Sequence, residues 1–226
     1  MLSDFEKIQY IDIHTHRSPD KLSVRALQSF FIDDAPENSE QFFSAGIHPW
    51  QVESDNTRIK QKARQLFAKK KLSAIGEIGL DRRKNSSLFS QQKAVFIWQL
   101  NMAEELGLPV IIHCVKAYSD LLSVFKDVSP ELPLIIHGYN ENIQTATQLL
   151  KHNVYFSFGE FLFNENSEAA KSFSETKNDK IFLETDESSY SISEIYKKAA
   201  DLKGIDISKL KSIIKQNYSS VFEHRL

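Results

Sequence analysis

Short apolar runs alternate with amphipathic stretches along almost the whole chain. Several of the runs are apolar throughout, which is typical of strands that are covered on both faces. The predicted strands are 9–13, 24–31, 43–47, 72–78, 109–113, 133–137, 154–158 and 181–184. Helical spacing of apolar residues covers 59–66, 95–106, 143–150, 195–202 and 208–222. Strand–helix alternation predicts a parallel α/β sheet, and its length favours a closed barrel.

The first quarter of the chain departs from this alternation. Residues 17–22 alone separate the first two predicted strands, whereas a parallel crossover needs about a dozen residues or more. We therefore expect the barrel to lack its first outer helix, and the second strand to be irregular or antiparallel. The sequence contains no internal repeat, low-complexity tract or second domain, so residues 1–226 are predicted to form a single domain.

Composition narrows the classes of function. The chain has 28 basic and 30 acidic residues and a net charge of −2, which argues against binding a long polyanion along a basic stripe. It does not exclude holding one or two phosphates. The single cysteine, Cys114, excludes an intramolecular disulfide and fits a reducing compartment. Neither a secretory signal nor an apolar run of about 18–20 residues is present, so we expect a cytoplasmic protein without a membrane partner.

Side chains that can bind metal stand at or beside the C-terminal ends of the apolar runs. They are His14, His16, Glu77, His113, His137 and Asp186. In a parallel barrel the C-terminal strand ends form one ring, so residues far apart in the chain can meet in one pocket. Four imidazoles and two carboxylates suit a transition-metal or mixed divalent centre, and they are enough for two ions.

Each of these residues also has a structural interpretation. His14 and His16 lie on one face of an extended strand because side chains alternate with period two, but they could instead cap the strand. Glu77 lies in a nearly apolar run, where a carboxylate is costly unless it is paired or binds metal, so a buried salt bridge is the alternative. His113 and His137 could each be a core histidine bonded to the backbone.

Asp186 follows the last strand and could both bind metal and accept a proton from an attacking water, which makes it the predicted catalytic base. Glu184 lies on the same face and is expected to hydrogen-bond a ligand. His48 could carry a proton, contact a phosphate or cap its strand, and Asp81 could orient a ligand histidine. Phenylalanines are expected to pack in the barrel and at its rim, with stacking on a substrate base as the alternative. They are Phe156, Phe158, Phe161 and Phe163.

Together the segments IDIHTH, GIHPW, AIGEIGLD, LPVIIH, IIHGY, VYFSFG and FLETD resemble the TatD-type deoxyribonucleases, a branch of the metal-dependent amidohydrolase superfamily. The resemblance implies a distorted TIM barrel, two divalent ions (Zn, Mg or Mn) and hydrolysis of phosphodiesters in DNA, often from the 3′ end. By position, His14, His16 and Asp186 match the ligands of one ion. Glu77 matches a catalytic ligand that the two ions share. His113 and His137 match the ligands of the other ion.

Two departures from the family pattern concern the substrate. Val115 stands where the family has an arginine, and the basic loop that follows the last strand is absent. The remaining candidate substrate contacts are His48, Arg82 and Lys116, together with Arg83. We expect a phosphodiesterase acting on DNA or oligonucleotide ends, with no obligate protein partner. A small-molecule amide, lactone or phosphoester hydrolase is the alternative, and a non-catalytic binding protein is a third possibility.

Overall fold

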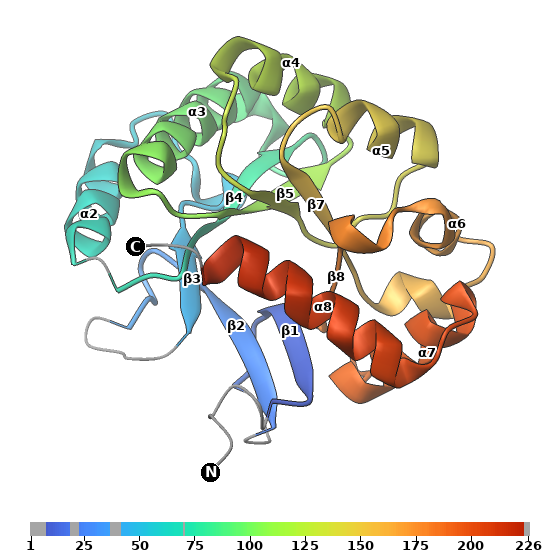
Figure 1. Ribbon diagram of the computed structural model, residues 1–226. Helices are drawn as coiled ribbons and strands as arrows, with labels where there is room; N and C mark the ends of the chain where they lie inside the picture. Colours follow the sequence, from blue (N-terminus) through green and yellow to red (C-terminus); the bar gives the residue numbers. More distant parts are fainter. Residues whose placement is uncertain (1–7, 19–22, 37–41, 70, 224–226) are drawn as a thin grey trace. The chain divides into compact units, whose positions relative to one another are not determined.

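The computed structural model describes residues 8–18, 23–36, 42–69 and 71–223 (Figure 1). Its contacts divide the chain into two compact units. Unit 1 contains residues 1–28, 137–148 and 155–226, and unit 2 contains residues 29–136 and 149–154. All eight predicted strands are present, with ends that differ from the prediction by at most a few residues. The prediction of a single domain over residues 1–226 stays a prediction.

Unit 1 contains β1 (Tyr10–Thr15), β8 (Ile181–Leu183) and most of β2 (Val24–Phe31) and β7 (Val154–Phe158). β7 pairs with β8 and β1 pairs with β2, in both cases in parallel. An isolated parallel bridge between Thr15 and Asp186 connects the ends of β1 and β8. The unit is therefore a parallel sheet in which the ends of the first and last strands of the chain meet.

The second strand is irregular, as predicted, but the antiparallel alternative was wrong. Asp12 pairs with Ala26, whereas Thr15 pairs with Gln28, so β1 holds one extra residue between these two pairs. Residues 16–18 and 23 contain no helix, and residues 19–22 of the same connection lie outside the described residues.

Among its described residues, unit 1 contains α6 (Glu168–Glu175), α7 (Ile192–Lys203), α8 (Ile207–Phe222) and all of α5 (Ile143–Leu149) except its last residue. A capping box between Ser191 and Glu194 starts α7, and Gly204 ends it in the left-handed conformation. Tyr196 fixes α7 to β1 because its hydroxyl accepts from the amide of Ile11 and donates to the carbonyl of the same residue. Asn217 ties α8 to β8 through the carbonyl of Ile181. The α6 helix was not among the predicted helical segments.

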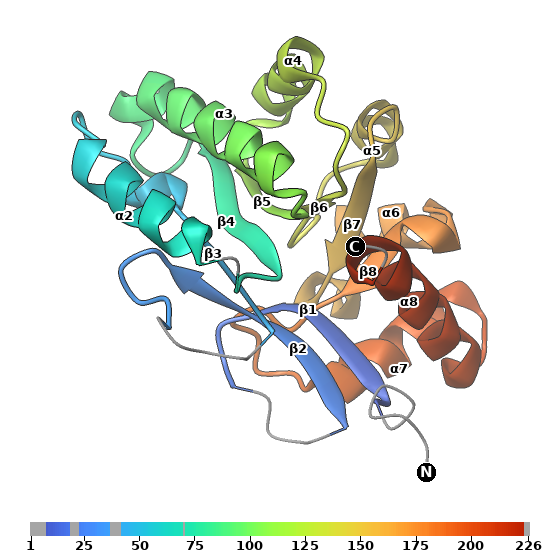
Figure 2. The same ribbon diagram turned by 60° about the vertical axis from the view of Figure 1, so that its left-hand side comes forward.

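Unit 2 contains β3 (Phe43–Gly46), β4 (Ala74–Asp81), β5 (Val110–Val115) and β6 (Leu134–Ile136), paired in parallel in this order. Helices α2 (Thr57–Ala68), α3 (Phe89–Leu106) and α4 (Tyr118–Val128) accompany these strands (Figure 2). Every residue of β4 is buried, as expected for a strand covered on both faces. The α4 helix was not predicted. No helix of the described residues is long and apolar enough to cross a membrane.

Gly79 allows β4 and β5 to approach each other closely. Its φ of 151° lies outside the range that other residues favour, and a Cβ added there would lie 1.9 Å from the carbonyl oxygen of His113. A glycine is therefore required at this point, and it sets the position of the β5 backbone beside a predicted metal ligand.

Candidate metal sites

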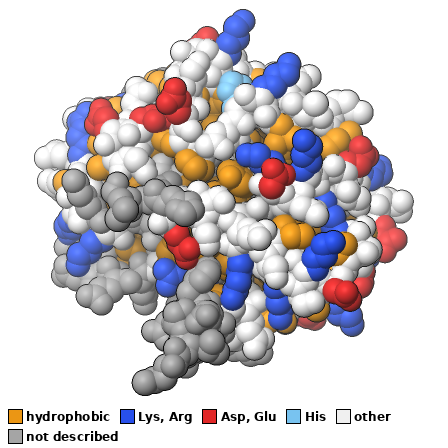
Figure 3. All heavy atoms as spheres, in the orientation of Figure 1, with side chains coloured by type: hydrophobic (Ala, Val, Ile, Leu, Met, Phe, Trp, Pro, Cys, Tyr) orange, Lys and Arg blue, Asp and Glu red, His pale blue; other side chains and the backbone are white. Residues whose placement is uncertain are grey.

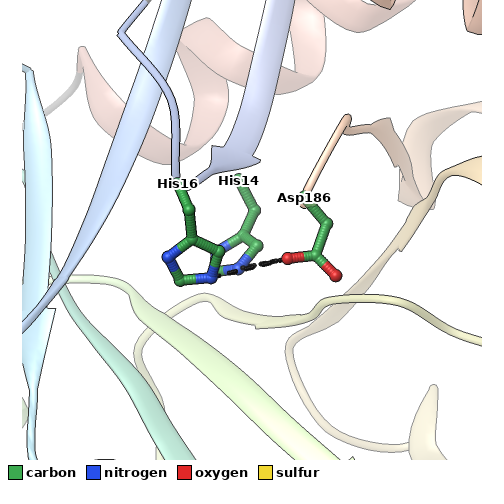
Figure 4. Close-up of side chains that lie close together, drawn as sticks. All are labelled: His14, His16 and Asp186. Carbon is green, nitrogen blue, oxygen red and sulfur yellow. Dashed lines mark ion pairs between the residues drawn. The ribbon is translucent and has the colours of Figure 1, made fainter. Parts of the chain in front are cut away.

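Three predicted ligands meet in unit 1 at the ends of β1 and β8. Nε2 of His14 and Nε2 of His16 each lie 3.5 Å from Oδ1 of Asp186 (Figure 4). Ligand atoms about 2.1 Å from a tetrahedral ion lie about 3.4 Å from one another. The spacing and the donor set, two imidazole nitrogens and a carboxylate, therefore fit one divalent ion.

The backbone explains why these three side chains meet. The amide of Asp186 donates to the carbonyl of His14 at 2.9 Å, which continues the pairing of β8 with β1 beyond the end of β8. Asp186 has a φ of 49°, in the left-handed region that aspartate tolerates better than most residues. Its side chain is 39% exposed, whereas that of His14 is fully buried. Water can therefore reach the carboxylate of Asp186.

His137 and Glu184 lie beside this cluster in unit 1. The rings of His137 and His14 have their centroids 4.2 Å apart. Oε1 of Glu184 accepts a hydrogen bond from the amide of Gly138 at 2.6 Å and lies 3.6 Å from Nδ1 of His137. Because Glu184 is almost fully buried, its carboxylate is held in place next to the histidine, which is the arrangement that orients a metal-ligating imidazole.

Asp12 is a buried carboxylate that sequence reasoning did not single out. It connects β1 to the segment that follows β8. Asp12 accepts hydrogen bonds from the amide and the hydroxyl of Thr185, at 3.0 and 2.6 Å. Burial raises the pKa of Asp12 to about 7, against the lowering effect of those hydrogen bonds. The sequence signal was available, because Asp12 is a charged residue within an apolar run, as Glu77 is.

The second cluster lies entirely in unit 2. Oε1 of Glu77 is 2.6 Å from Nδ1 of His113 and 3.2 Å from Nε2 of His48, and all three side chains are buried. Nδ1 of His48 accepts the amide proton of Trp50. A neutral His48 ring therefore carries its proton on Nε2 and donates it to Glu77. The side chain of His48 also caps the short helix η1 (Pro49–Gln51), so the cap predicted as one alternative is confirmed, and the contact with Glu77 adds an orienting role. The proton-carrier and phosphate-contact alternatives stay predictions.

Asp81 lies behind His113. Oδ2 of Asp81 accepts the indole N–H of Trp50 at 2.7 Å and is 3.3 Å from Nε2 of His113. Burial alone would raise the pKa of this carboxyl, but hydrogen bonds from His113, Trp50 and the amides of Lys84 and Arg83 outweigh it and hold the pKa below its usual range. These bonds favour the ionised form of Asp81 and place it where it can orient the His113 ring; that His113 is a metal ligand stays a prediction.

Two of the basic substrate candidates, Arg82 and Lys116, follow paired residues of β4 and β5 in unit 2, because Asp81 pairs with Val115. Arg82 donates to both carboxylate oxygens of Asp120, at 2.8 and 2.9 Å, and lies over the ring of Phe89. Lys116 is exposed immediately after β5, at a φ of 53°. Their predicted contacts with substrate stay predictions, as does the metal-binding role of each ligand.

Comparison with known proteins identifies the family of this chain. The sequence model of the TatD-related DNase family matches residues 21–223, a span that includes Glu77, His113, His137 and Asp186. The chain belongs to this family. An uncharacterised metal-dependent hydrolase of Bacillus subtilis, YabD, is 31% identical over 201 residues, which are 80% of this chain and 77% of YabD. The 3′–5′ ssDNA/RNA exonuclease TatD of Pantoea ananatis is 35% identical over 108 residues, 47% of this chain and 42% of that protein.

Solved structures agree on the fold. The TatD homologue YjjV of Escherichia coli has a TM-score of 0.83 over 97% of this chain and all of YjjV, at 17% identity. A TatD-family hydrolase of Entamoeba histolytica has a TM-score of 0.73 over 95% of this chain and 98% of that chain, at 15% identity. The fold of this TatD-family protein is therefore the distorted TIM barrel that the sequence predicted. It is a metal-dependent hydrolase with histidine–carboxylate clusters that can hold metal ions.

Proposed function

We propose that this TatD-family protein hydrolyses phosphodiesters at the ends of single-stranded DNA or oligonucleotides. The observation that carries the proposal is the cluster of His14, His16 and Asp186, whose donor set and 3.5 Å spacing suit one divalent ion. The second cluster, around Glu77 and His113 in unit 2, supplies ligands for a second ion. Relatives named as 3′–5′ ssDNA/RNA exonucleases support the choice of substrate and of the 3′ end.

A divalent ion held by these residues would polarise a phosphoryl oxygen and make a neighbouring water more acidic. Asp186 is the proposed base because its carboxylate is partly exposed and lies beside two imidazole nitrogens. The water oxygen bonds to phosphorus, its proton passes to Asp186, and the P–O bond to the leaving nucleoside breaks. The leaving oxygen then takes up a proton. Glu77, His113 and His137 are proposed to bind metal, with His48, Asp81 and Glu184 orienting them.

The near-neutral net charge of the chain supports recognition of a chain end. On the face shown in Figure 3, the basic and acidic side chains of the described residues are interspersed, without a broad basic stripe. A long duplex is held mainly through phosphate contacts along such a stripe. A single-stranded end, by contrast, can be held by metal ions and a few local contacts. We further propose that the protein acts in the cytoplasm, in line with the reducing compartment inferred from Cys114.

The test is hydrolysis of a single-stranded oligonucleotide, labelled at either end, with Mg²⁺, Mn²⁺ or Zn²⁺ and after chelation. Cleavage should need the ion and should shorten the strand from its 3′ end. Asp186→Asn should lower kcat at least about 100-fold, since general-base catalysis contributes about 10²–10⁴-fold. Glu187→Gln, an exposed neighbouring acid, is the matched control and should keep full activity.

A panel of amides, lactones and small phosphoesters separates this proposal from small-molecule hydrolysis. Turnover of a panel member with no turnover of any oligonucleotide would contradict the proposed substrate. Full activity of Asp186→Asn would contradict the proposed base.

A further inference from the structure

Two exposed aromatic side chains lie in the loops that follow β7 and β8 of unit 1. Among the described residues, large hydrophobic side chains with 37% or more of their surface exposed are few, and they include Phe161 and Tyr190, at 44% and 37%. A single exposed aromatic residue is ordinary on a protein surface. Two in the segments that follow the paired strands β7 and β8, the second of which leads to Glu184 and Asp186, point to a contact surface.

Tyr190 is already arranged for stacking. Its ring lies parallel to that of Phe163, with 3.7 Å between the centroids and 5° between the planes. The backbone amide of Tyr190 donates to the hydroxyl of the buried Ser188, which fixes the loop that carries the ring. Because Phe163 covers one face of the tyrosine ring, the opposite face is the one that can receive a flat ligand.

The same tyrosine borders a pocket of unit 1 that is lined by residues of β1, β2, the segment after β8 and the start of α7, and His14, His16 and Asp186 are not among its lining residues. The pocket has a volume of about 480 Å³ and is lined by residues that include Thr15, Arg17, Thr185 and Tyr190. Thr15 stands between His14 and His16, and Thr185 precedes Asp186. A cavity of this size falls in the range that binds small ligands.

Arg17 is the basic residue of the pocket lining, which also contains the acids Asp12 and Glu194. Its Nη2 donates to the carbonyl oxygen of Glu187 at 2.7 Å, which holds the guanidinium beside the loop that carries Tyr190. A guanidinium has five N–H donors in a planar fork, so this contact uses a small part of its capacity. Arginine suits a phosphate oxygen better than lysine does, because the fork can bond to it twice.

We propose that Tyr190, backed by Phe163, stacks on an unpaired base of a single-stranded substrate, while Arg17 contacts a neighbouring phosphate. This inference rests on the proposed function and names the subsite that selects an unpaired strand. Stacking between a base and an aromatic ring contributes about 1–3 kcal/mol and does not depend on sequence. Stacking on Tyr190 requires a base that is not in a base pair, so the end of a duplex would bind less well than a single strand. The net charge of the chain is −2, so long-range attraction contributes little to its affinity for a nucleic acid. A stacking contact would supply part of that affinity.

The test compares two single-stranded oligonucleotides that differ only in whether the last two nucleotides at the 3′ end carry bases or are abasic. Phosphorothioate linkages at that end slow cleavage, so that fluorescence anisotropy can give Kd with divalent metal present. Tyr190→Ala should weaken binding of the base-bearing strand about 10-fold and leave the abasic strand unchanged. Tyr190→Phe keeps the ring and should bind like the wild type.

Two further variants sharpen the result. Ile207→Ala removes an equally exposed apolar side chain from α8 and should change neither Kd. Arg17→Gln should weaken both strands and reduce the slope of log K against log salt by about 0.7, the value for one phosphate contact with a single strand.

Equal effects of Tyr190→Ala on the two strands, or no effect, would overturn the stacking subsite, because a merely structural role does not distinguish a base from its absence. Failure of the proposed function looks different. In that case the wild-type protein hydrolyses neither oligonucleotide when their linkages are ordinary phosphodiesters, whatever the anisotropy shows.

Discussion

The indole nitrogen of Trp50 donates a hydrogen bond to Asp81 at 2.7 Å, and the accepting oxygen is the one that lies 3.3 Å from Nε2 of His113. A half-exposed tryptophan thus helps to hold the carboxylate that orients a proposed metal ligand. The backbone amides of Arg83 and Lys84 donate hydrogen bonds to the other carboxylate oxygen of Asp81, Oδ1. The side chains of Trp50 and Asp81 therefore act on the site through His113.

Asp81→Asn should lower the metal affinity of the unit 2 cluster about 10- to 100-fold, as is typical when a carboxylate behind a ligating histidine is lost. Trp50→Phe, which removes one of the hydrogen bonds to Asp81 and keeps an aromatic ring, should have a smaller effect. Calorimetric titration of the metal-free protein with Mn²⁺ or Zn²⁺ measures both. Asp120→Asn, which alters an acid paired with Arg82, is the control and should leave metal affinity unchanged. Unaltered affinity in Asp81→Asn would contradict the assigned role.

Gly79→Ala should destabilise the protein by about 3 kcal/mol or more, because its Cβ would lie 1.9 Å from the carbonyl oxygen of His113. Gly107→Ala is the matched control, since Gly107 also has a positive φ, of 64°, but a Cβ added there would meet no atom within 4 Å. That substitution should cost about 1 kcal/mol, the penalty of the left-handed conformation alone. Urea unfolding of the two variants gives both values, and similar costs would argue against the close approach of β4 and β5.

Removal of divalent metal should lower the thermal unfolding midpoint, and its return should restore it, because an ion that binds only the folded chain stabilises it. At a free concentration 100 times Kd the gain is about 2.7 kcal/mol per site. His16→Ala removes one ligand of the unit 1 cluster and should lose a part of this gain, whereas Glu187→Gln should retain it. A midpoint that is indifferent to metal in the wild type would argue against ion binding at these clusters.

Stability should depend on pH through Lys203. Burial lowers the pKa of this lysine to about 8, from an ordinary value of 10.5. Between these two values the unfolded chain binds the proton more tightly than the folded chain, so the free energy of unfolding should rise with pH over this window. Below about pH 8 the lysine is charged in both states and adds no slope.

Lys203→Met isolates this contribution, because it removes the charge and keeps an apolar stem near Phe173. The difference in unfolding free energy, wild type minus variant, should increase between about pH 8 and pH 10 in urea titrations. A difference that stays constant would mean that Lys203 has an ordinary pKa.

The alternation of apolar runs was enough to predict the eight strands, because strands that are buried on both faces need continuous apolar sequence. Helices α4 and α6 were missed, and the antiparallel alternative for β2 was wrong. Whether β1 and β2 pair in parallel depends on the path that the connection between them takes. The number of residues in the connection does not determine that path. The register shift between Asp12 and Thr15 likewise has no local sequence signal.

The candidate ligand residues could be named from their chemistry and their place at strand ends, and the structure brings several of them together in groups that could hold a metal ion. His14 and His16 follow from period two, and Glu77 from the cost of a carboxylate in an apolar run. The contacts that orient them could not be predicted, because the partners are distant in the chain. Trp50 meets Asp81, and Gly138 meets Glu184, only once the strands are paired.

The sequence by itself determined the kinds of element, their order and the donor atoms that are available for metal, since these depend on local periodicity and side-chain chemistry. Only the tertiary structure decided which donors meet, which basic groups are engaged, and where an aromatic face stays exposed. Arg82 is paired with Asp120, and Tyr190 is stacked on Phe163 beside the pocket. The physical reason is that a contact between side chains needs a distance and an orientation, and both are set by packing between segments that the chain brings together only when it folds.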